Sequence, residues 1–167
     1  MPKPLWAPWR LEYVGQADEL SGCPLCAEAA DEVEETLVVQ RGATAFALLN
    51  KYPYSAGHLI LAPYAHVAEL EELGDETALE LHRLSVAALA ALRELYRPAG
   101  FNLGWNIGRA AGAGIPEHAH LHVVPRWNGD TSFMPVLGDA KVIPEHLLET
   151  RDRLRAVWAD RDFISAP

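Results

Sequence analysis

Hydrophobic residues recur along the chain with two different spacings, and each spacing predicts one kind of element. Three short apolar runs, each bounded by turn-forming residues, are typical of β-strands: residues 36–39, 45–49 and 58–62. Strands that follow one another at such short intervals predict an antiparallel meander. A further strand is predicted at residues 101–107, where hydrophobic residues alternate with polar residues or glycine.

Helical spacing appears in two segments. Residues 75–97 carry hydrophobic side chains at steps of three and four and end before Pro98, which predicts a long amphipathic helix. A second helix is predicted from 144 to about 158, with Leu147, Leu154, Val157 and Trp158 inward and Arg151, Arg153 and Arg155 largely outward. The order of elements predicts an α+β fold: a mostly antiparallel sheet of about five strands, one long helix and a C-terminal helix.

Residues 118–125 are the last expected strand, and they place His118, His120 and His122 at every second position. Alternate residues of a strand share a face, so three imidazoles would stand together while the residues between them face a core. Crowded imidazoles must be hydrogen-bonded, metal-bound or partly neutral, because desolvation and like charge both oppose their protonation. We therefore expect the function of the protein at this face.

The connection between the last two expected strands is short and rich in glycine, spanning residues 108–117. A link of this length predicts that strands 101–107 and 118–125 are antiparallel neighbours. Asn106 would then lie near the imidazoles.

Composition narrows the choice of partners. A chain of 167 residues is long enough for one domain with a sizeable core. The formal charge of −9, with 23 acidic and 14 basic residues, argues against a nucleic-acid partner. The N-terminal residues form no apolar signal segment and the most apolar helix is interrupted by charges, so we expect a cytoplasmic protein with no membrane partner.

The two cysteines, Cys23 and Cys26, form a Cys-Pro-Leu-Cys pair. Two closely spaced cysteines cannot build a disulfide framework, but such a pair can be a redox site or half of a metal site. A thioredoxin-like redox site would need a βαβ context that the predicted elements lack. A metal site or a reduced, metal-free pair remains open.

The run His-x-His-x-His-Val-Val-Pro-Arg closely resembles the signature of the histidine triad family of nucleotide hydrolases and transferases. The resemblance extends over Gly57 to His66 and over Asn106-Ile107-Gly108. Three outer stretches resemble the branch of bacterial diadenosine tetraphosphate phosphorylases: Trp6 to Arg10, Pro125 to Phe133 and Lys141 to Pro144. We expect a single domain of this family over residues 1–167, with an N-terminal arm (1–22) and a C-terminal extension (126–167).

The resemblance implies a catalytic set. His120 would attack the α-phosphorus of a nucleotide and form a covalent nucleotidyl-histidine, while His122 would stabilise phosphate oxygens or transfer a proton to the leaving group. His58 would hold the tautomer of a catalytic histidine. Asn50 stands at the position where family members usually carry a residue that contacts the ribose hydroxyls. By residue type alone, a role as a turn-forming asparagine is nearly as well supported.

Asn106 and the glycine-rich connection would supply hydrogen-bond donors to the nucleotide phosphates. Many family members carry Gly-Gln-Ser or Gly-Gln-Thr before the triad, whereas this chain has Gly112-Ala113-Gly114. Contacts from side chains of that segment are therefore in doubt. Backbone N–H groups near Gly112 and Gly114 could replace them, because glycine lets the backbone approach a ligand closely.

The family also suggests a partner set for the cysteines. In zinc-bearing triad proteins and galactose-1-phosphate uridylyltransferases, such a pair combines with the histidine that closes a Pro-x-x-His segment and with the first triad histidine. The corresponding residues here are His66 and His118. Cys23, Cys26, His66 and His118 would complete four ligands, which implies a structural zinc and requires no organic cofactor.

Several functions remain open. The leading hypothesis is phosphorolysis of diadenosine tetraphosphate to ATP and ADP with inorganic phosphate as acceptor, through a nucleotidyl transferase. Hydrolysis of dinucleoside polyphosphates or of adenosine phosphoramidates would use the same histidine with water as acceptor. A catalytic metal on the triad and nucleotide binding without turnover are further alternatives.

The family commonly pairs as homodimers, so we expect a homodimer in which residues 101–107 or the long helix take part. His82 and His146 are expected at the surface.

Overall fold

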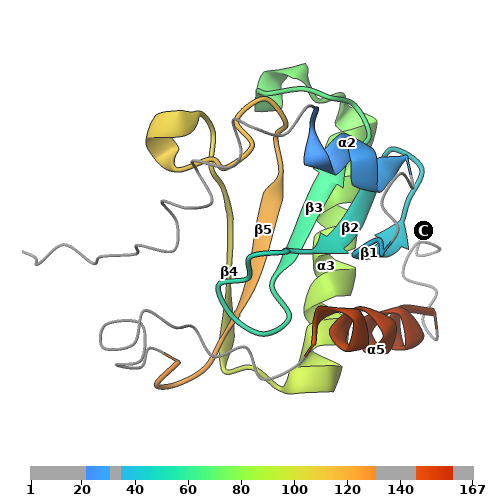
Figure 1. Ribbon diagram of the computed structural model, residues 1–167, viewed down its shortest axis with the longest axis vertical. Helices are drawn as coiled ribbons and strands as arrows, with labels where there is room; N and C mark the ends of the chain where they lie inside the picture. Colours follow the sequence, from blue (N-terminus) through green and yellow to red (C-terminus); the bar gives the residue numbers. More distant parts are fainter. Residues whose placement is uncertain (1–21, 31–34, 131–145, 160–167) are drawn as a thin grey trace, which may run out of the picture.

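The structure is a computed structural model that describes residues 22–30, 35–130 and 146–159 (Figure 1). The expected features at residues 6–10, 133 and 141–144 lie outside these residues, as do most of the N-terminal arm and much of the C-terminal extension. Within the described part, no helix is long and apolar enough to cross a membrane.

Five strands form one antiparallel sheet in the spatial order β1-β2-β3-β5-β4. Their bounds are Val38–Arg41 (β1), Ala45–Leu49 (β2), Leu59–Pro63 (β3), Gly100–Trp105 (β4) and Leu121–Arg126 (β5). The helices are α2 (Pro24–Ala29), α3 (Asp75–Tyr96) and α5 (Leu147–Ala159), with short 3-10 turns at Leu70–Glu72 (η1) and Arg109–Ala111 (η2). The predicted α+β fold with a five-stranded antiparallel sheet is confirmed.

The main difference from the predicted strands concerns the histidines. β5 begins at Leu121, so His118 and His120 precede the strand and only His122 lies within it. The ladder with β3 joins 59–61 to 121–123, and the ladder with β4 begins at the pair Trp105 and Leu121. The three imidazoles therefore do not stand on one regular strand.

The two faces of the sheet build two separate cores. One face packs on α3 and α5 through every second residue of the strands, such as Leu49, Leu61 and Val123. The opposite face packs on α2 through Leu25, Phe46 and Ile60, among others. Alternation along each strand produces this division, because successive side chains point to opposite faces.

The α2 helix is only six residues long, yet hydrogen bonds attach its C-terminal end to the sheet. The Arg41 guanidinium donates to the carbonyls of Glu28 and Ala29 at its C-terminal end. The Glu28 carboxylate accepts from the Thr36 hydroxyl and the Leu37 amide before β1. Proline at the first helical position suits this start, since that residue needs no N–H partner.

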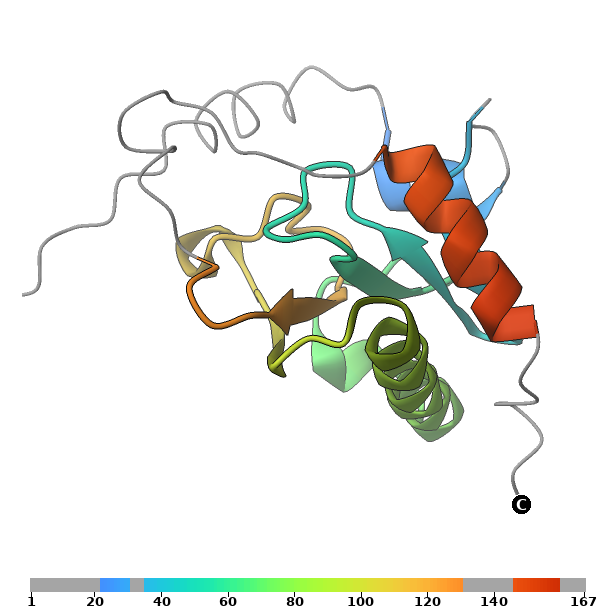
Figure 2. The same cartoon turned by 90° about the horizontal axis from the view of Figure 1, so that it is seen from below.

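The C-terminal helix lies at the β1 side of the sheet, while α3 is seen nearly end-on in Figure 2. Leu154 and Trp158 enter the core as predicted. The expectation that the arginines point largely outward is wrong for two of them: Arg151 donates to the carbonyl of Thr36 and Arg155 to that of Val38. These carbonyls lie at the outer edge of the sheet, where no further strand of the described residues donates to them.

Candidate functional site

His122 is positioned by the sheet on both sides. Its strand pairs it with Ile60 of β3 and with Gly104 of β4. Ile60 belongs to the core under α2, so His122 lies on the face of the sheet opposite α3. Because Gly104 has no side chain, β4 leaves space beside the imidazole, and a Cβ built at Gly104 meets no atom within 4 Å.

His120 is buried and held in one tautomer. Its ring is 4% exposed, and its Nδ1 lies 2.7 Å from the His118 carbonyl oxygen. A carbonyl oxygen only accepts hydrogen bonds, so Nδ1 must carry the proton and Nε2 must carry the lone pair. Burial lowers the pKa of His120, although the bond to the His118 carbonyl opposes that shift. A neutral imidazole with a free Nε2 lone pair is a competent nucleophile at neutral pH.

His58 and His122 form a second hydrogen-bonded pair whose polarity is set by the backbone. The Tyr54 amide donates to Nδ1 of His58 at 3.0 Å, which leaves the His58 proton on Nε2. That N–H donates to Nδ1 of His122, also at 3.0 Å. A neutral His122 therefore carries its proton on Nε2, and its ring centroid lies 4.9 Å from that of His120.

Tyr54 also belongs to this site, although no motif of the sequence marks it. Its ring lies 4.7 Å from the His58 ring and 5.9 Å from the His122 ring, measured between centroids. The turn that carries Tyr54 is attached to β5, because the Ser55 hydroxyl donates to the Pro125 carbonyl. An aromatic residue in a polar turn carries no periodic signal, so only the tertiary structure reveals this contact.

The two asparagines lie beside this pair. Nδ2 of Asn106 lies 3.3 Å from Nε2 of His122, as the short β4–β5 connection predicts. With a proton on that Nε2, a half-turn of the carboxamide places its oxygen there as the acceptor. Asn50 accepts a hydrogen bond from the Tyr52 amide, and its Nδ2 lies 3.3 Å from Nδ1 of His58. Asn50 thus forms an Asx turn and supports His58, and a contact with a ribose stays a prediction.

The glycine-rich connection folds into η2. Gly112 adopts φ +87°, which favours glycine, and its amide donates to the Arg109 carbonyl. Gly114 lies two residues further on, in the segment that leads to His118. That these backbone groups bind phosphate stays a prediction.

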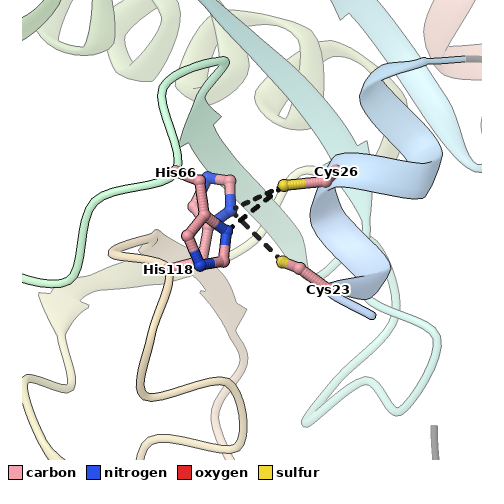
Figure 3. Close-up of side chains that lie close together, drawn as sticks. All are labelled: Cys23, Cys26, His66 and His118. Atoms are coloured by element: carbon pink, nitrogen blue, oxygen red, sulfur yellow. Dashed lines mark hydrogen bonds between the residues drawn. The ribbon is translucent and has the colours of Figure 1, made fainter. Parts of the chain in front are cut away.

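Cys23, Cys26, His66 and His118 gather into one cluster, in which all four ligand atoms lie within 4.8 Å of one another. Figure 3 shows the thiols of Cys23, just before α2, and of Cys26, within α2, facing the two imidazoles. Sγ of Cys23 lies 3.3 Å from Nδ1 of His118, and Sγ of Cys26 lies 3.3 Å from Nδ1 of His66 and 3.6 Å from Nδ1 of His118. A tetrahedral zinc ion would place neighbouring nitrogen and sulfur donors roughly 3.5 Å apart, so the spacing fits a metal.

The chemistry of the donors fits a cation as well. Nε2 of His118 lies 2.9 Å from the Pro63 carbonyl oxygen, so its proton is on Nε2 and the Nδ1 lone pair faces the thiols. Burial lowers the pKa of His118, which favours the neutral ligand form. Burial and the neighbouring Cys23 raise the pKa of Cys26 to about 11. Two adjacent thiolates need a positive charge between them, which a metal ion supplies.

The fold and this pair of sites define the class of protein. The profile of the HIT domain matches residues 31–129. The chain belongs to the HIT family, the histidine triad family whose motif the sequence carries.

Relatives of this chain are found among bacteria and archaea. The chain is 42% identical over 165 aligned residues to a protein named AP-4-A phosphorylase from Mycobacterium tuberculosis (strain H37Rv), covering 93% of this chain and 84% of that protein. A Zn-bound histidine triad family protein from Mycobacterium smegmatis has a similar structure, with a TM-score of 0.68, 26% identity, and coverage of 83% and 94%. A histidine triad nucleotide-binding protein from Sulfolobus tokodaii matches with a TM-score of 0.68, 27% identity, and coverage of 83% and 93%.

Proposed function

We propose that this protein is a nucleotidyl transferase that phosphorolyses diadenosine tetraphosphate to ATP and ADP. The observation that carries the proposal is the state of His120: a buried, neutral imidazole whose Nε2 lone pair is free because Nδ1–H is bonded to the His118 carbonyl. The relative named AP-4-A phosphorylase, which matches almost the whole chain, supports the choice of substrate.

The reaction consists of two displacements at one phosphorus atom. Nε2 of His120 attacks an α-phosphorus of diadenosine tetraphosphate, the bond to the bridging oxygen breaks, and ATP leaves with the electron pair. An oxygen of inorganic phosphate then attacks the AMP–histidine intermediate, the phosphorus–nitrogen bond breaks, and ADP leaves. A covalent intermediate divides one difficult displacement into two easier ones.

The residues around His120 have supporting roles in this proposal. His122 presents an N–H at Nε2 that stabilises the phosphate oxygens or the departing oxygen, and His58 fixes that tautomer through the bond to Nδ1 of His122. Asn106, Asn50 and the backbone at Gly112 and Gly114 would contact the nucleotide. Water in place of phosphate would make the same protein a hydrolase.

Products of diadenosine tetraphosphate, resolved by chromatography with and without inorganic phosphate, test the proposal. We expect ADP and ATP in equal amounts only when phosphate is present, and no cleavage by the His120→Ala variant. The control is His82→Ala, since His82 is exposed on α3. Cleavage without phosphate would identify a hydrolase, and full activity of His120→Ala would exclude His120 as the nucleophile.

We also propose that Cys23, Cys26, His66 and His118 hold a structural zinc ion. Four protein ligands complete a tetrahedral shell and leave no position for substrate. Metal analysis of the purified protein should find about one zinc per chain. Protein with intact thiols, never exposed to chelator and free of zinc, would contradict this assignment.

In the cell, we propose that the protein works in the cytoplasm as a homodimer, with nucleotides and phosphate rather than nucleic acid or membrane as partners. The net charge of −9 supports the absence of a nucleic-acid partner. The outer side of β4, with Leu103 43% exposed, supports an interface between two copies.

A further inference from the structure

No hydrogen bond of the two strand ladders holds the segment that carries His120. The ladder between β3 and β5 begins at Leu121, and so does the ladder between β4 and β5. His118, Ala119 and His120 are nevertheless all buried. Other contacts must therefore fix the backbone at His120.

Most of the hydrogen bonds that hold this segment lead to the cysteine–histidine cluster or to a residue beside it. The Ala119 amide donates to the carbonyl of Val67, the residue after His66, at 2.7 Å. His118 faces the thiols of Cys23 and Cys26 through Nδ1, and it donates through Nε2 to the carbonyl of Pro63, the last residue of β3. A weaker bond joins the His118 amide to the Ile115 carbonyl at 3.4 Å.

The orientation of the His120 ring depends on the same backbone. Its hydrogen bond to a described residue is the one from Nδ1 to the carbonyl of His118, which is itself a member of the cluster. This bond determines which nitrogen carries the lone pair. A small rotation of the peptide between His118 and Ala119 would move the carbonyl and release the ring.

We infer that the metal centre of Cys23, Cys26, His66 and His118 is a positioning element for the nucleophile. Metal bound at the four side chains fixes His118 and the His66 turn, these fix the backbone from His118 to His120, and that backbone fixes the tautomer and direction of His120. The site therefore controls catalysis without touching substrate. This inference rests on the proposed role of His120 as nucleophile.

The test compares full-length protein with and without zinc, and uses His66→Ala as a milder variant. His66 is exposed and contributes to the cluster through Nδ1, so its replacement weakens metal binding without removing His118. His82→Ala is the matched control. The readouts are zinc content, hydrogen exchange at the Ala119 amide, and ¹⁵N chemical shifts of the His120 ring, which report its tautomer.

Loss of zinc should speed exchange at Ala119 by about tenfold or more, mix the two tautomers of His120, and slow formation of the nucleotidyl-histidine by roughly 10- to 100-fold. Added zinc should reverse all three in the wild-type protein. Exchange within β5 and the circular dichroism spectrum should not change.

Two results would overturn the inference. In the first, zinc-free protein keeps a protected Ala119 amide and a single His120 tautomer. In the second, exchange within β5 rises as much as at Ala119, so that the metal holds the whole fold rather than this segment. Exchange and ¹⁵N shifts need no substrate, so failure of diadenosine tetraphosphate cleavage is a separate result.

Discussion

Backbone groups determine the proton positions of three buried histidines. Carbonyl oxygens of Pro63 and His118 place protons on Nε2 of His118 and Nδ1 of His120. The Tyr54 amide places the proton of His58 on Nε2. Neighbouring imidazoles thus present a ligand lone pair, a nucleophilic lone pair and an N–H donor, and the difference lies in their hydrogen-bond partners.

Replacement of His58 by alanine should slow the reaction more than it weakens substrate binding. The variant leaves the Tyr54 amide without its acceptor and removes the donor to Nδ1 of His122. We expect kcat to fall by roughly 10- to 100-fold and the free energy of unfolding to fall by about 1–3 kcal/mol. Steady-state kinetics and urea titration check both, and an unchanged kcat would refute the positioning role of His58.

Gly57 should tolerate no side chain. Its φ is +71°, and a Cβ there would lie 2.8 Å from Cδ2 of Leu92. Gly57→Ala should destabilise the protein by about 1–3 kcal/mol, because it combines a strained backbone with crowding of α3. The control is Gly100→Ala, where the added methyl meets nothing within 4 Å. Equal melting temperatures of the two variants would contradict the expectation.

At the level of elements, α3 is joined to the β1–β2 turn by one carboxylate. Glu80 accepts hydrogen bonds from the Thr44 hydroxyl and from the amides of Ala43, Thr44 and Ala45. A Cβ at Gly42 would meet the Glu80 carboxylate, so a side chain there would displace this carboxylate from its hydrogen bonds. Partial burial raises the pKa of Glu80, but the hydrogen bonds outweigh that effect and the net pKa lies below the usual value.

This arrangement has a defined pH dependence. Because the pKa of Glu80 is lower in the folded state, its contribution to stability is complete above the unfolded value of 4.5 and is lost as the pH falls through the folded value. Glu80→Gln should cost about 1.5–3 kcal/mol at pH 7, and less as the pH falls below about 4.5.

Urea titration of wild type and Glu80→Gln, at pH 7 and at a pH below about 4.5, measures the difference in free energy of unfolding between the two proteins. Glu76→Gln, an exposed position of the same helix, is the control and should change little. A difference that stays constant with pH would show that the charge of Glu80 is not what stabilises the turn.

Local spacing predicted most elements, but not the contacts between distant segments. The strand at residues 45–49 and the long helix were predicted within a residue of their bounds, since alternation and helical spacing are strong there. The α2 helix was missed, because six residues are too few for a periodic signal. The start of β5 was placed three residues early, because period two continues through His118 and His120 although their backbone leaves the ladder.

The same limit applies to the site. Family motifs identified the four cluster residues, which the fold brings together. The bond between His58 and His122 joins residues 64 positions apart, and the ring of Tyr54 covers both. Alternation along one strand cannot reveal such a pair. The inward direction of the Arg151 and Arg155 side chains likewise depends on backbone carbonyls more than a hundred residues away in the sequence.

At the scale of the whole molecule, the two edges of the sheet differ. At β1, guanidinium groups of α5 bond carbonyls of the edge. At β4, the described residues include no element that pairs with the outer side, and Asn102, Leu103 and Gly104 are exposed. An exposed edge strand invites pairing with another chain.

Leu103→Asp should therefore convert the proposed homodimer to a monomer. An aspartate on each of two adjoining strands adds desolvation and like-charge repulsion at the interface. Light scattering coupled to gel filtration measures the mass. Leu70→Asp is the matched control, because Leu70 is similarly exposed but lies in η1, outside both expected interface elements. If Leu103→Asp leaves the mass of a dimer unchanged, β4 is not the interface.

The arginine contacts of α5 also limit how far such assembly can proceed. Strand pairing through two open edges would add copies without end and lead to a fibre. Arg151 and Arg155 bond the carbonyls at β1, so in the described residues only the β4 edge of each copy is open to another strand. When two copies pair through β4 about a twofold axis, neither has an open edge left for a third copy. Removing these arginines should therefore expose the chain to filament growth, in addition to any loss of stability.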